Sequence, residues 1–380
     1  MTAPRSPEIY IGLMSGTSLD GVDIAIVDFN CKPPKALLTE THPYAAPVKL
    51  RIKDITHDKT ASIDTLCQLN IELGHIYASV VNESLRKADL DKTQIRAIGN
   101  HGQTIRHCPD AIFPYTLQLG DPNTLAVETG ITTVTDFRGV DIALGGQGAP
   151  LAPAFHRSVF SSSTTDRVII NIGGIANITY LPSNPAEKII GFDTGPGNTL
   201  SDYWVGLHKN LNYDDVGQWA KSGRVIDELL SEIADKEPFF KQTAPKSTGT
   251  DHFNSTWISN FNISNYSPND IQATLIELTA LSIADSISGL AKPSIECFVC
   301  GGGARNLHLI ERIQKRLPKS LIQTTEQLNI DPDYVEAIAF AWLAKQRIDN
   351  EPGNLPSSTH ANRLGILGGV FSGNNLDMTY

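Results

Sequence analysis

The chain has 380 residues, of which 41% are hydrophobic and 19% are charged, a composition typical of soluble globular proteins. This length is too great for one ordinary hydrophobic core and favours two domains. The formal net charge of -10 comes without long acidic blocks. It argues against nucleic acid or an anionic membrane as the main partner, because both favour clustered Lys and Arg.

No segment reads as a targeting sequence or a membrane span. The opening residues, MTAPRSPE, contain no apolar signal-peptide core, and no later run approaches the roughly 18–20 apolar residues that cross a bilayer. We therefore expect a cytoplasmic protein. The five cysteines are scattered, and Cys297 and Cys300 lie in a predicted strand with their side chains on opposite faces, so we expect no disulfide framework.

The first half of the chain predicts strands and helices around glycine-rich turns. Residues 9–29 read as a strand, a turn and a second strand with partial alternation. A helix-rich stretch follows over 62–88, and then a buried strand, IRAIG, runs into NHGQT at 100–104. The segment 139–153 is rich in Gly and Pro and marks a domain boundary. We predict a first domain over 1–145.

The second half repeats this plan. Residues 168–181 again predict strand, turn and strand, and the strand KIIGF then runs into DTGPGN. Helical patterns follow near 197–207, 223–235 and 270–290, before the strand IECFVC runs into GGGARN. We predict a second domain over 146–347.

The C-terminal helix 332–347 has an apolar face at helical spacing, suited to pack back onto the first domain. The segment 348–380 is a further candidate for such packing. Strands that end in glycine turns and lead into helices predict an α/β fold, in which ligands collect at the carboxyl ends of the strands.

The loop GTSLDG, at 16–21, is a candidate phosphate site. Its glycines allow backbone N–H groups to converge on an anion, and Thr17 and Ser18 add hydroxyl donors. The loop lacks the lysine of a Walker A motif, and no lysine precedes Lys32, so charge neutralisation would fall to a metal. Asp20, and less surely Asp23, could hold Mg²⁺ directly or through water. An ordinary hairpin turn would have the same residue types.

Two further glycine turns suggest nucleotide contacts. Gly173 and Gly174, in NIGGIAN, would offer backbone donors that grip the β- and γ-phosphates from the side opposite the first loop. The triple glycine of CGGGARN would let an adenine or ribose approach the main chain closely. Its glycines are Gly301, Gly302 and Gly303.

The motif GFDTGPGN gives the strongest single indication. The strand KIIGF delivers Asp193 to a predicted strand end, where turn glycines leave room for a substrate. A carboxylate there can act as a general base on a water or hydroxyl beside a bound phosphate. The structural alternative is an Asp that only bonds Thr194 and caps the turn.

Polar residues gather near the predicted domain boundary, and their mix suits hydrogen bonding to sugar hydroxyls. They are His101, Gln103, Asp136, Arg138, Asp141 and Gln147. Arg138 suits a substrate carboxylate, but an ion pair with Asp136 or Asp141 is an equal alternative. Glu336, on the C-terminal helix, is either a substrate contact or an ordinary helix acid.

Six motifs in one order resemble the anhydro-N-acetylmuramic acid kinase family of the actin, Hsp70 and sugar kinase superfamily. They are GLMSGTSLDGVD, NHGQT, TDFRGVDIALGGQGAPLAP, NIGGIAN, GFDTGPGN and CGGGARN. The resemblance runs from about residue 9 to the helix ending near 347. It implies two ribonuclease-H-like (actin-like ATPase) domains around a nucleotide cleft.

The resemblance also implies a reaction and a site. ATP phosphates would lie on the loop formed by Gly16, Thr17, Ser18, Leu19, Asp20, Gly21, Val22 and Asp23, with Mg²⁺ as the accompanying ion. Asp193 would be the catalytic base, and the substrate would be 1,6-anhydro-N-acetylmuramic acid from cell-wall turnover. The product would be N-acetylmuramic acid 6-phosphate, and the enzyme would be a cytoplasmic homodimer.

Two alternatives remain open at this stage. Another kinase of the superfamily would use Asp193 to deprotonate a simple sugar hydroxyl. An actin-like binding module driven by ATP would turn over no small molecule.

Overall fold

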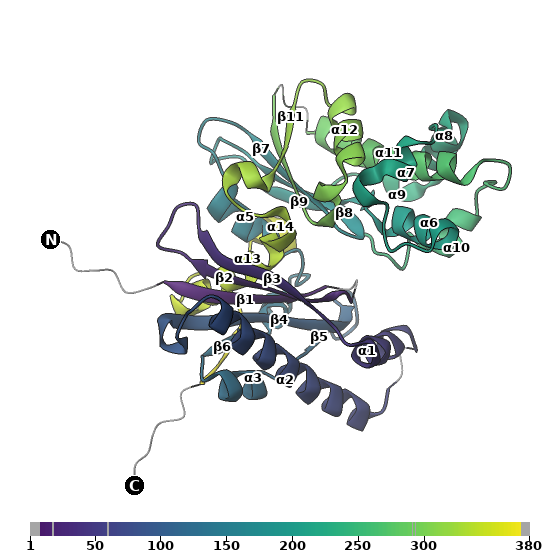
Figure 1. Cartoon of the computed structure of the whole chain (residues 1–380). Helices are drawn as coiled ribbons and strands as arrows, with labels where there is room; N and C mark the ends of the chain where they lie inside the picture. The colour runs from purple at the N-terminus through teal and green to yellow at the C-terminus, as the bar shows by residue number, and fades with distance from the viewer. Residues whose placement is uncertain (1–7, 17–18, 59–60, 291, 293, 374–380) are drawn as a thin grey trace, which may run out of the picture. The chain divides into compact units, whose positions relative to one another are not determined.

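The computed structural model describes residues 8–16, 19–58, 61–290, 292 and 294–373 (Figure 1). Its contacts divide the chain into two compact units. Unit 1 runs to residue 155 and resumes at residue 334, and unit 2 is the stretch 156–333. The division thus falls later than the predicted boundary at 145. The helix predicted at 332–347 lies almost wholly in unit 1, which agrees with its expected packing onto the first domain but not with the predicted second-domain limit at 347.

Unit 1 is built on one mixed sheet with the strand order β12-β6-β4-β1-β2-β3, and β5 pairs with β4. The strands are β1 (Ile9–Ser15), β2 (Gly21–Asp28), β3 (Lys35–Pro43), β4 (Ile95–Cys108), β5 (Tyr115–Leu119), β6 (Thr133–Thr135) and β12 (Gly369–Phe371). The first three form an antiparallel meander, whereas β4 runs parallel to β1 and β6 runs parallel to β4.

Helices cover both faces of this sheet (Figure 1). The helices of unit 1 are α1 (Ala46–Asp58), α2 (Ile63–Lys87), η1 (Lys92–Gln94), α3 (Pro122–Thr129), α4 (Phe137–Ala143), α13 (Val335–Ile348) and α14 (Pro356–Thr359), and α5 (Ala152–Phe160) crosses the division. On one face, Ile11 and Leu13 of β1 share a core with Leu69 and Tyr77 of α2. The alternate residues of β1 face α13, since side chains in a strand point to opposite faces in turn.

Unit 2 repeats the same strand plan, in the order β11-β10-β7-β8-β9. Its strands are β7 (Arg167–Ile172), β8 (Ile175–Leu181), β9 (Ile190–Pro196), β10 (Glu296–Cys300) and β11 (Leu321–Thr324). Strands β7, β8 and β9 form an antiparallel meander, β10 is parallel to β7, and β11 is parallel to β10. Both units therefore have the ribonuclease-H-like topology that the family resemblance implied.

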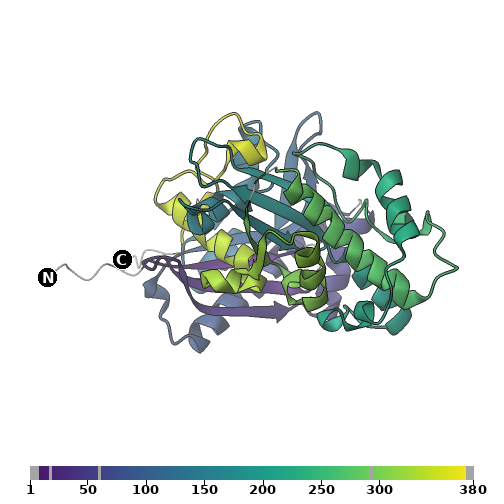
Figure 2. The same cartoon turned by 90° about the horizontal axis from the view of Figure 1, so that it is seen from above.

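The helices of unit 2 include α11, which packs Ile276, Ala280 and Ile283 against the sheet and is the long green helix of Figure 2. The others are α6 (Thr199–Lys209), η2 (Asp215–Gly217), α7 (Gln218–Lys221), α8 (Asp227–Lys236), α9 (Pro238–Lys241), α10 (Ser255–Ser259), α11 (Pro268–Ser288), η3 (Gly302–Arg305), α12 (Leu307–Arg316), η4 (Thr325–Leu328) and η5 (Pro332–Tyr334). The predicted helices near 197–207, 223–235 and 270–290 correspond to α6, α8 and α11.

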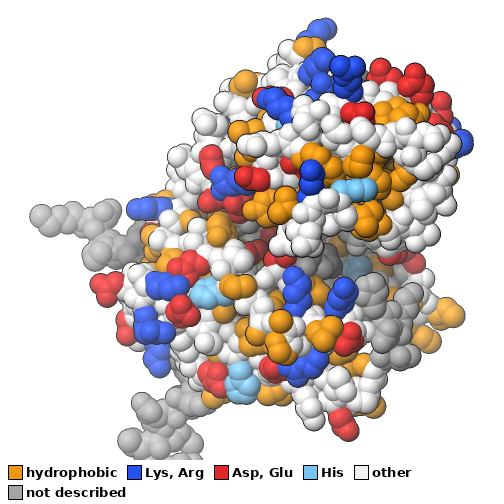
Figure 3. Space-filling model, turned by 45° about the vertical axis from the view of Figure 1, so that its right-hand side comes forward, with side chains coloured by type: hydrophobic (Ala, Val, Ile, Leu, Met, Phe, Trp, Pro, Cys, Tyr) orange, Lys and Arg blue, Asp and Glu red, His pale blue; other side chains and the backbone are white. Residues whose placement is uncertain are grey.

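Two surface properties bear on the expected partners. In the part of the chain that the structure describes, no helix has both the length and the hydrophobicity needed to cross a bilayer. On the face shown in Figure 3, acidic and basic side chains are interspersed.

Candidate active site

The loop between β1 and β2 in unit 1 begins at Gly16, whose carbonyl accepts a hydrogen bond from the Leu19 amide at 3.3 Å. Leu19 is buried and has a left-handed backbone, with φ of 60°. Thr17 and Ser18, the predicted hydroxyl donors, lie outside the described residues. The glycine at position 21 has a packing cause, since a Cβ there would lie 2.2 Å from the His42 carbonyl oxygen on β3. Val22 is fully buried in the core.

The two acidic residues of this loop differ in their surroundings. The Asp20 side chain is 76% exposed, and its carboxylate lies 3.7 Å from the Lys49 ammonium. Asp23 accepts a hydrogen bond of 2.6 Å from the Thr41 hydroxyl. Among the described residues, no group of three His, Cys, Asp or Glu side chains could hold a metal by itself. An exposed single carboxylate such as Asp20 still fits Mg²⁺, which commonly keeps several waters and takes its other ligands from phosphates.

A buried cluster of hydroxyl groups lies at the carboxyl end of β1. The Tyr44 hydroxyl donates to Ser15 Oγ at 2.9 Å, and the Tyr77 hydroxyl lies 3.2 Å from Ser15 Oγ and 3.1 Å from the Tyr44 oxygen. Burial raises the pKa of both tyrosines, so both stay protonated. Gln103 on β4 donates to the Gly16 carbonyl at 3.3 Å. These contacts fix the start of the loop, and the sequence indicated only Gln103.

His101 and Arg138 lie together in unit 1. The Arg138 Nε and Nη2 atoms lie 3.1 and 3.0 Å from His101 Nε2, and Nη1 donates to the Gly148 carbonyl at 2.8 Å. Burial and the Arg138 charge hold the pKa of His101 well below its usual value, so the imidazole is neutral and Nε2 can accept. The described residues show no ion pair between Arg138 and Asp136 or Asp141 within 4 Å.

The other polar residues of this region hold the backbone. Asp136, with a left-handed φ of 58°, accepts a bond from the Gly139 amide and caps α4. Asp141 is fully buried and accepts three bonds of 2.8 Å, from the Gly148 amide, Asn354 Nδ2 and Thr359 Oγ1. Gln147 donates to Asp110 at 3.1 Å. Asp141 therefore ties the C-terminal segment to unit 1.

Glu336 lies in the first turn of α13. Desolvation and the Asp23 carboxylate raise the pKa of Glu336, whereas the Arg138 guanidinium lowers it. Solvent still reaches this residue. Unit 1 thus brings Asp23, Arg138 and Glu336 into electrostatic reach of one another, which the sequence did not indicate.

In unit 2, Asp193 lies within β9 rather than after its end, because the strand continues to Pro196. One carboxylate oxygen, Oδ2, accepts two hydrogen bonds, from Ser247 Oγ at 3.0 Å and from the Thr248 amide at 2.9 Å. Desolvation raises the pKa of Asp193, and these two donors lower it. Thr194 donates instead to the Ala176 carbonyl, so the alternative of an Asp bonded to Thr194 does not hold. The sequence gave no indication of Ser247 or Thr248.

The turn at Gly173 and Gly174 is joined to the start of α6. The Asn198 amide donates to the Gly173 carbonyl, and the amides of Gly197 and Thr199 donate to the Gly174 carbonyl, at 2.8 to 3.1 Å. These three amides are therefore already occupied. A Cβ at Gly173 would meet nothing nearer than 3.7 Å, whereas one at Gly174 would lie 3.1 Å from Thr250 Cγ2, so the turn is open to a ligand at Gly173 alone.

The three glycines after β10 serve different purposes. Gly301 has φ of 77° and donates to the Pro332 carbonyl at 2.8 Å. A Cβ at Gly303 would lie 2.3 Å from the side chain of Ile172. Gly302 is the open position, since its nearest neighbour would be Asn198 Nδ2 at 3.9 Å. Among the three, only Gly302 is required neither by its backbone conformation nor by packing. Close approach of a ligand can therefore explain the glycine at this position.

Comparison with known protein families identifies the family to which the chain belongs. The family model for anhydro-N-acetylmuramic acid kinase matches residues 8–373. The chain belongs to the anhydro-N-acetylmuramic acid kinase family.

Curated relatives agree with this kinase assignment over nearly their whole length. The chain is 49% identical over 372 residues to the anhydro-N-acetylmuramic acid kinase of Saccharophagus degradans, covering 96% of this chain and 99% of that one. It is 48% identical over 367 residues to the protein of the same name from Coxiella burnetii (strain RSA 493 / Nine Mile phase I), with 96% and 98% covered. The Pasteurella multocida protein is 46% identical over 366 residues, with 95% and 96% covered.

Solved structures align more distantly with this kinase. The activator of the 2-hydroxyisocaproyl-CoA dehydratase from Clostridium difficile, with bound ADPNP, gives a TM-score of 0.44 at 14% identity, over 90% of this chain and 96% of that one. A ROK family glucokinase from Streptomyces griseus gives 0.40 at 12% identity, over 89% and 99%. Because both scores are below 0.5, the family assignment rests on sequence.

Proposed function

We propose that this kinase opens the anhydro bridge of 1,6-anhydro-N-acetylmuramic acid with water and places the γ-phosphoryl group of ATP on O6. The products are N-acetylmuramic acid 6-phosphate and ADP. Membership of the family over residues 8–373 supports the substrate class. The observation that carries the chemistry is Asp193, a partly desolvated carboxylate with one oxygen bound by two donors.

Asp193 serves as the general base. It takes a proton from water as the water oxygen bonds to the anomeric carbon and the bond between that carbon and O6 breaks. The leaving O6 forms a bond to phosphorus as the bond to ADP breaks, so no separate acid is needed to protonate it. One carboxylate therefore does the work for which an inverting glycosidase uses two.

Ser247 and Thr248 hold the base in its reactive state. Their hydrogen bonds favour the carboxylate anion, against the desolvation that favours the neutral acid. With Oδ2 occupied, Oδ1 is the oxygen left to accept the proton. Activity falls as the pH drops through the pKa of Asp193, because a protonated base cannot accept a proton.

The nucleotide binds the loop 16–23 and the glycine turns of unit 2, on this proposal. Gly173, Gly174 and Gly302 contribute main-chain surface, while Gly301 and Gly303 keep the neighbouring backbone in place. The Lys49 ammonium lies 3.7 Å from the Asp20 carboxylate and adds a positive charge beside the loop. The sequence analysis did not predict this charge. Mg²⁺ supplies charge neutralisation at the phosphates when bound, and Asp20 would hold it directly or through water.

The sugar acid binds polar residues of unit 1. Arg138, held by neutral His101, makes no ion pair within 4 Å among the described residues, and its guanidinium suits the lactyl carboxylate of the substrate. Glu336 is the candidate for a sugar hydroxyl. Gln103 acts through Gly16, and Asp136 acts through the cap of α4.

The cellular setting follows from this reaction. A sugar released from cell-wall turnover and a requirement for ATP suit a cytoplasmic enzyme, and we propose a homodimer. Light scattering of the purified protein at micromolar concentration tests the assembly, and a mass equal to that of one chain would contradict it.

A coupled ADP-release assay tests the function. The expected result is ADP formation with 1,6-anhydro-N-acetylmuramic acid and none with N-acetylmuramic acid, N-acetylglucosamine or glucose. Turnover of a simple sugar instead would assign the chain to another sugar kinase activity. ATP-dependent filaments without turnover of any sugar would assign it to the binding-module class.

A further inference from the structure

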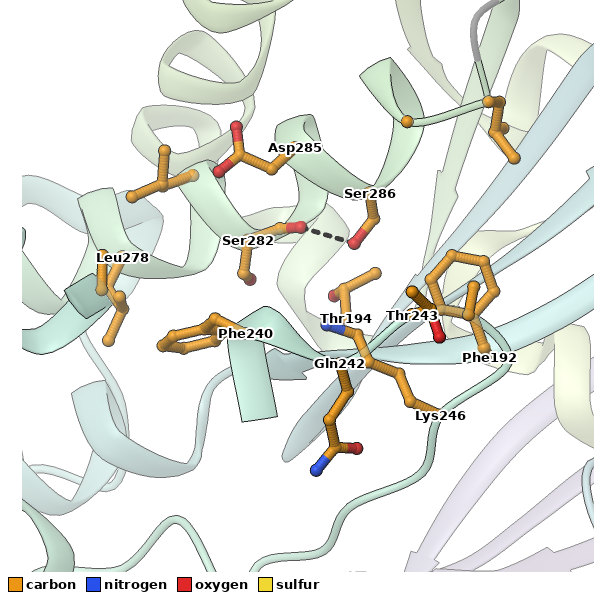
Figure 4. Close-up of a pocket in the computed structure, with 15 residues that line it drawn as sticks. Phe192, Thr194, Phe240, Gln242, Thr243, Lys246, Leu278, Ser282, Asp285 and Ser286 are labelled. Carbon is orange, nitrogen blue, oxygen red and sulfur yellow. Dashed lines mark hydrogen bonds between the residues drawn. The ribbon is translucent and has the colours of Figure 1, made fainter. Parts of the chain in front are cut away.

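A cavity lies inside unit 2, on the side of β9 away from Asp193. It has a volume of about 460 Å³ and is enclosed by β9, by the segment 242–246 and by the second half of α11 (Figure 4). Phe192 and Thr194 of β9 line it, so the intervening Asp193 points to the opposite face of the strand. Pockets that bind small organic molecules commonly measure about 300–1,000 Å³.

Seven of the fifteen residues that line the cavity have apolar side chains. The apolar lining residues are Phe192, Ala234, Phe240, Ala244, Leu278, Leu281 and Leu290. In Figure 4, Phe240 and Phe192 stand at opposite ends, with Ser282, Asp285 and Ser286 of α11 along one side. An aromatic or aliphatic body therefore suits the interior.

Most polar groups of the lining already donate hydrogen bonds to the protein itself. The hydroxyls of Thr194, Ser282 and Ser286 donate to main-chain carbonyl oxygens at 2.8 to 3.2 Å. The Lys246 ammonium donates to the Phe239 carbonyl at 3.1 Å and lies 4.4 Å from the Phe239 ring centre. The three hydroxyl oxygens therefore remain available to a ligand as acceptors.

Asp285 is the charged acceptor of the lining. Asp285 is exposed, so its carboxylate lies at the solvent side of the cavity. Among the described residues, no Lys, Arg or His nitrogen lies within 4 Å of the Asp285 carboxylate, the distance of an ion pair. Arg316 and Lys246 attract the carboxylate from farther away, and its pKa is nevertheless raised by desolvation. A cationic or donating head group could bond this carboxylate directly, which Arg316 and Lys246 do not do from their greater distance.

The segment that closes the cavity also holds the proposed base. Gln242, Thr243, Ala244 and Lys246 line the cavity. The Lys246 carbonyl accepts a bond of 3.0 Å from the Asp193 amide, and the next two residues donate to Asp193 Oδ2. A molecule in the cavity therefore contacts the same short segment that positions the Asp193 carboxylate.

We propose that this cavity is a binding site for a small cationic amphiphile, whose apolar body lies between β9 and α11 and whose ammonium group pairs with Asp285. Occupancy alters turnover through the segment 242–248. The coupling to turnover rests on the proposed function of Asp193, whereas the binding site does not.

Calorimetry with three indoles of equal body and different head groups tests the site on the full-length protein. Tryptamine should bind more tightly than tryptophol, and indole-3-acetate most weakly. In Asp285→Asn, tryptamine should lose at least about tenfold in affinity, while tryptophol changes by less than about twofold. Equal binding of the amine and the acid, or no binding of any of the three, would overturn the site.

A cavity-filling variant provides the matched control. Ser286→Phe should abolish binding of all three indoles, and Ser288→Phe, at an exposed position of the same helix that does not line the cavity, should not. Unfolding curves establish that both variants fold. Binding that survives Ser286→Phe in a folded protein would place the indoles elsewhere and refute the proposal.

Kinetics then tests the coupling separately. Saturating tryptamine should change kcat by more than about twofold and leave the KM of both substrates unchanged, and Ser286→Phe should remove this effect. Tight binding without any change in kcat would refute the coupling. Activity of the enzyme without indoles reports on the proposed function independently of either result.

Discussion

At Asp193 two opposing influences act on one carboxyl group. Desolvation favours its neutral form, while Ser247 and Thr248 donate to Oδ2 and favour the anion. A base of this kind must be ionised at working pH and still basic enough to take a proton from water. The pair of donors on one oxygen meets both needs, since the other oxygen is left for catalysis.

Replacing Asp193 by Asn removes the base without changing the shape of the side chain. Turnover should fall by about a hundredfold or more, the scale of a lost general base, with nucleotide affinity close to that of the wild type. Steady-state kinetics and calorimetry with a non-hydrolysable ATP analogue measure the two quantities. Retained turnover would remove Asp193 from the mechanism.

Ser247→Ala tests the donor that only the structure indicated. Loss of this hydrogen bond should raise the pKa of Asp193, so kcat/KM should begin to fall at a higher pH on the acid side. Ser247→Thr should restore the wild-type profile, and Ser231→Ala, at an exposed position of α8, should leave it unchanged. An unshifted acid limb in Ser247→Ala would show that the hydroxyl does not stabilise the anion.

The sequence points to single residues where a motif surrounds them, and the roles of these residues stay predictions. Asp193 was predicted from GFDTGPGN. Ser247 and Thr248 were not, because they lie 54 and 55 residues away and the bonds depend on a loop that folds back onto β9. Arg138 was predicted, but the choice of its partner was left open. His101 as an acceptor requires a neutral imidazole, which only burial establishes.

At the scale of elements, two glycines determine how α13 packs in unit 1. A Cβ on Gly12 of β1 would lie 1.8 Å from the Ala337 carbonyl oxygen, and one on Gly99 of β4 would lie 2.0 Å from that of Phe340. Helix backbone and strand backbone are therefore nearly in contact. This packing also determines the position of Glu336, in the first turn of the same helix.

Gly99→Ala should force α13 away from the sheet and destabilise the protein by about 2 kcal/mol or more, as overpacking does. Gly289→Ala is the control, because a Cβ there has no neighbour nearer than 3.4 Å and the backbone is helical, with φ of -63°. Urea unfolding measures both. A stability of Gly99→Ala within about 0.5 kcal/mol of wild type would contradict this close packing.

Strand boundaries were the weaker part of the sequence prediction. β9 runs on through Thr194, Gly195 and Pro196, because an edge strand tolerates residues that a central strand excludes. The segment 100–104 lies inside the long strand β4, although its Asn and Gly residues suggested a turn. Strand β3 was missed altogether, since its burial is only partial and it lies at the sheet edge.

At the scale of the whole molecule, the chain repeats one sheet plan in two units. The prediction of this repeat came from the strand, glycine turn and strand at 9–29 and at 168–181, and the pairing of both sheets confirms it. The apolar face of the helix predicted at 332–347 indicated that it packs back onto the first domain, and the chain does return to unit 1 at residue 334. The nonlocal contacts that hold this returning segment, such as the bonds from Asn354 and Thr359 to buried Asp141, could not be predicted from the sequence.

Nucleotide binding should stabilise the folded chain. A non-hydrolysable ATP analogue at a hundredfold excess over its dissociation constant should add about 2.7 kcal/mol, provided that Mg²⁺ is present. Asp20→Asn should weaken this effect if the carboxylate holds the ion. Thermal unfolding with and without a chelator measures it. A midpoint that rises equally in the absence of Mg²⁺ would contradict the proposed role of the metal.

The central claim is that one active site adds both water and a phosphoryl group to the bridged sugar. Mass spectrometry of a single incubation with ATP, Mg²⁺ and 1,6-anhydro-N-acetylmuramic acid tests it most directly. We expect a product heavier than the substrate by one water and one phosphoryl group, formed in equal amount with ADP and almost absent with Asp193→Asn. A phosphorylated sugar that keeps its anhydro bridge, or an opened sugar without phosphate, would contradict the account.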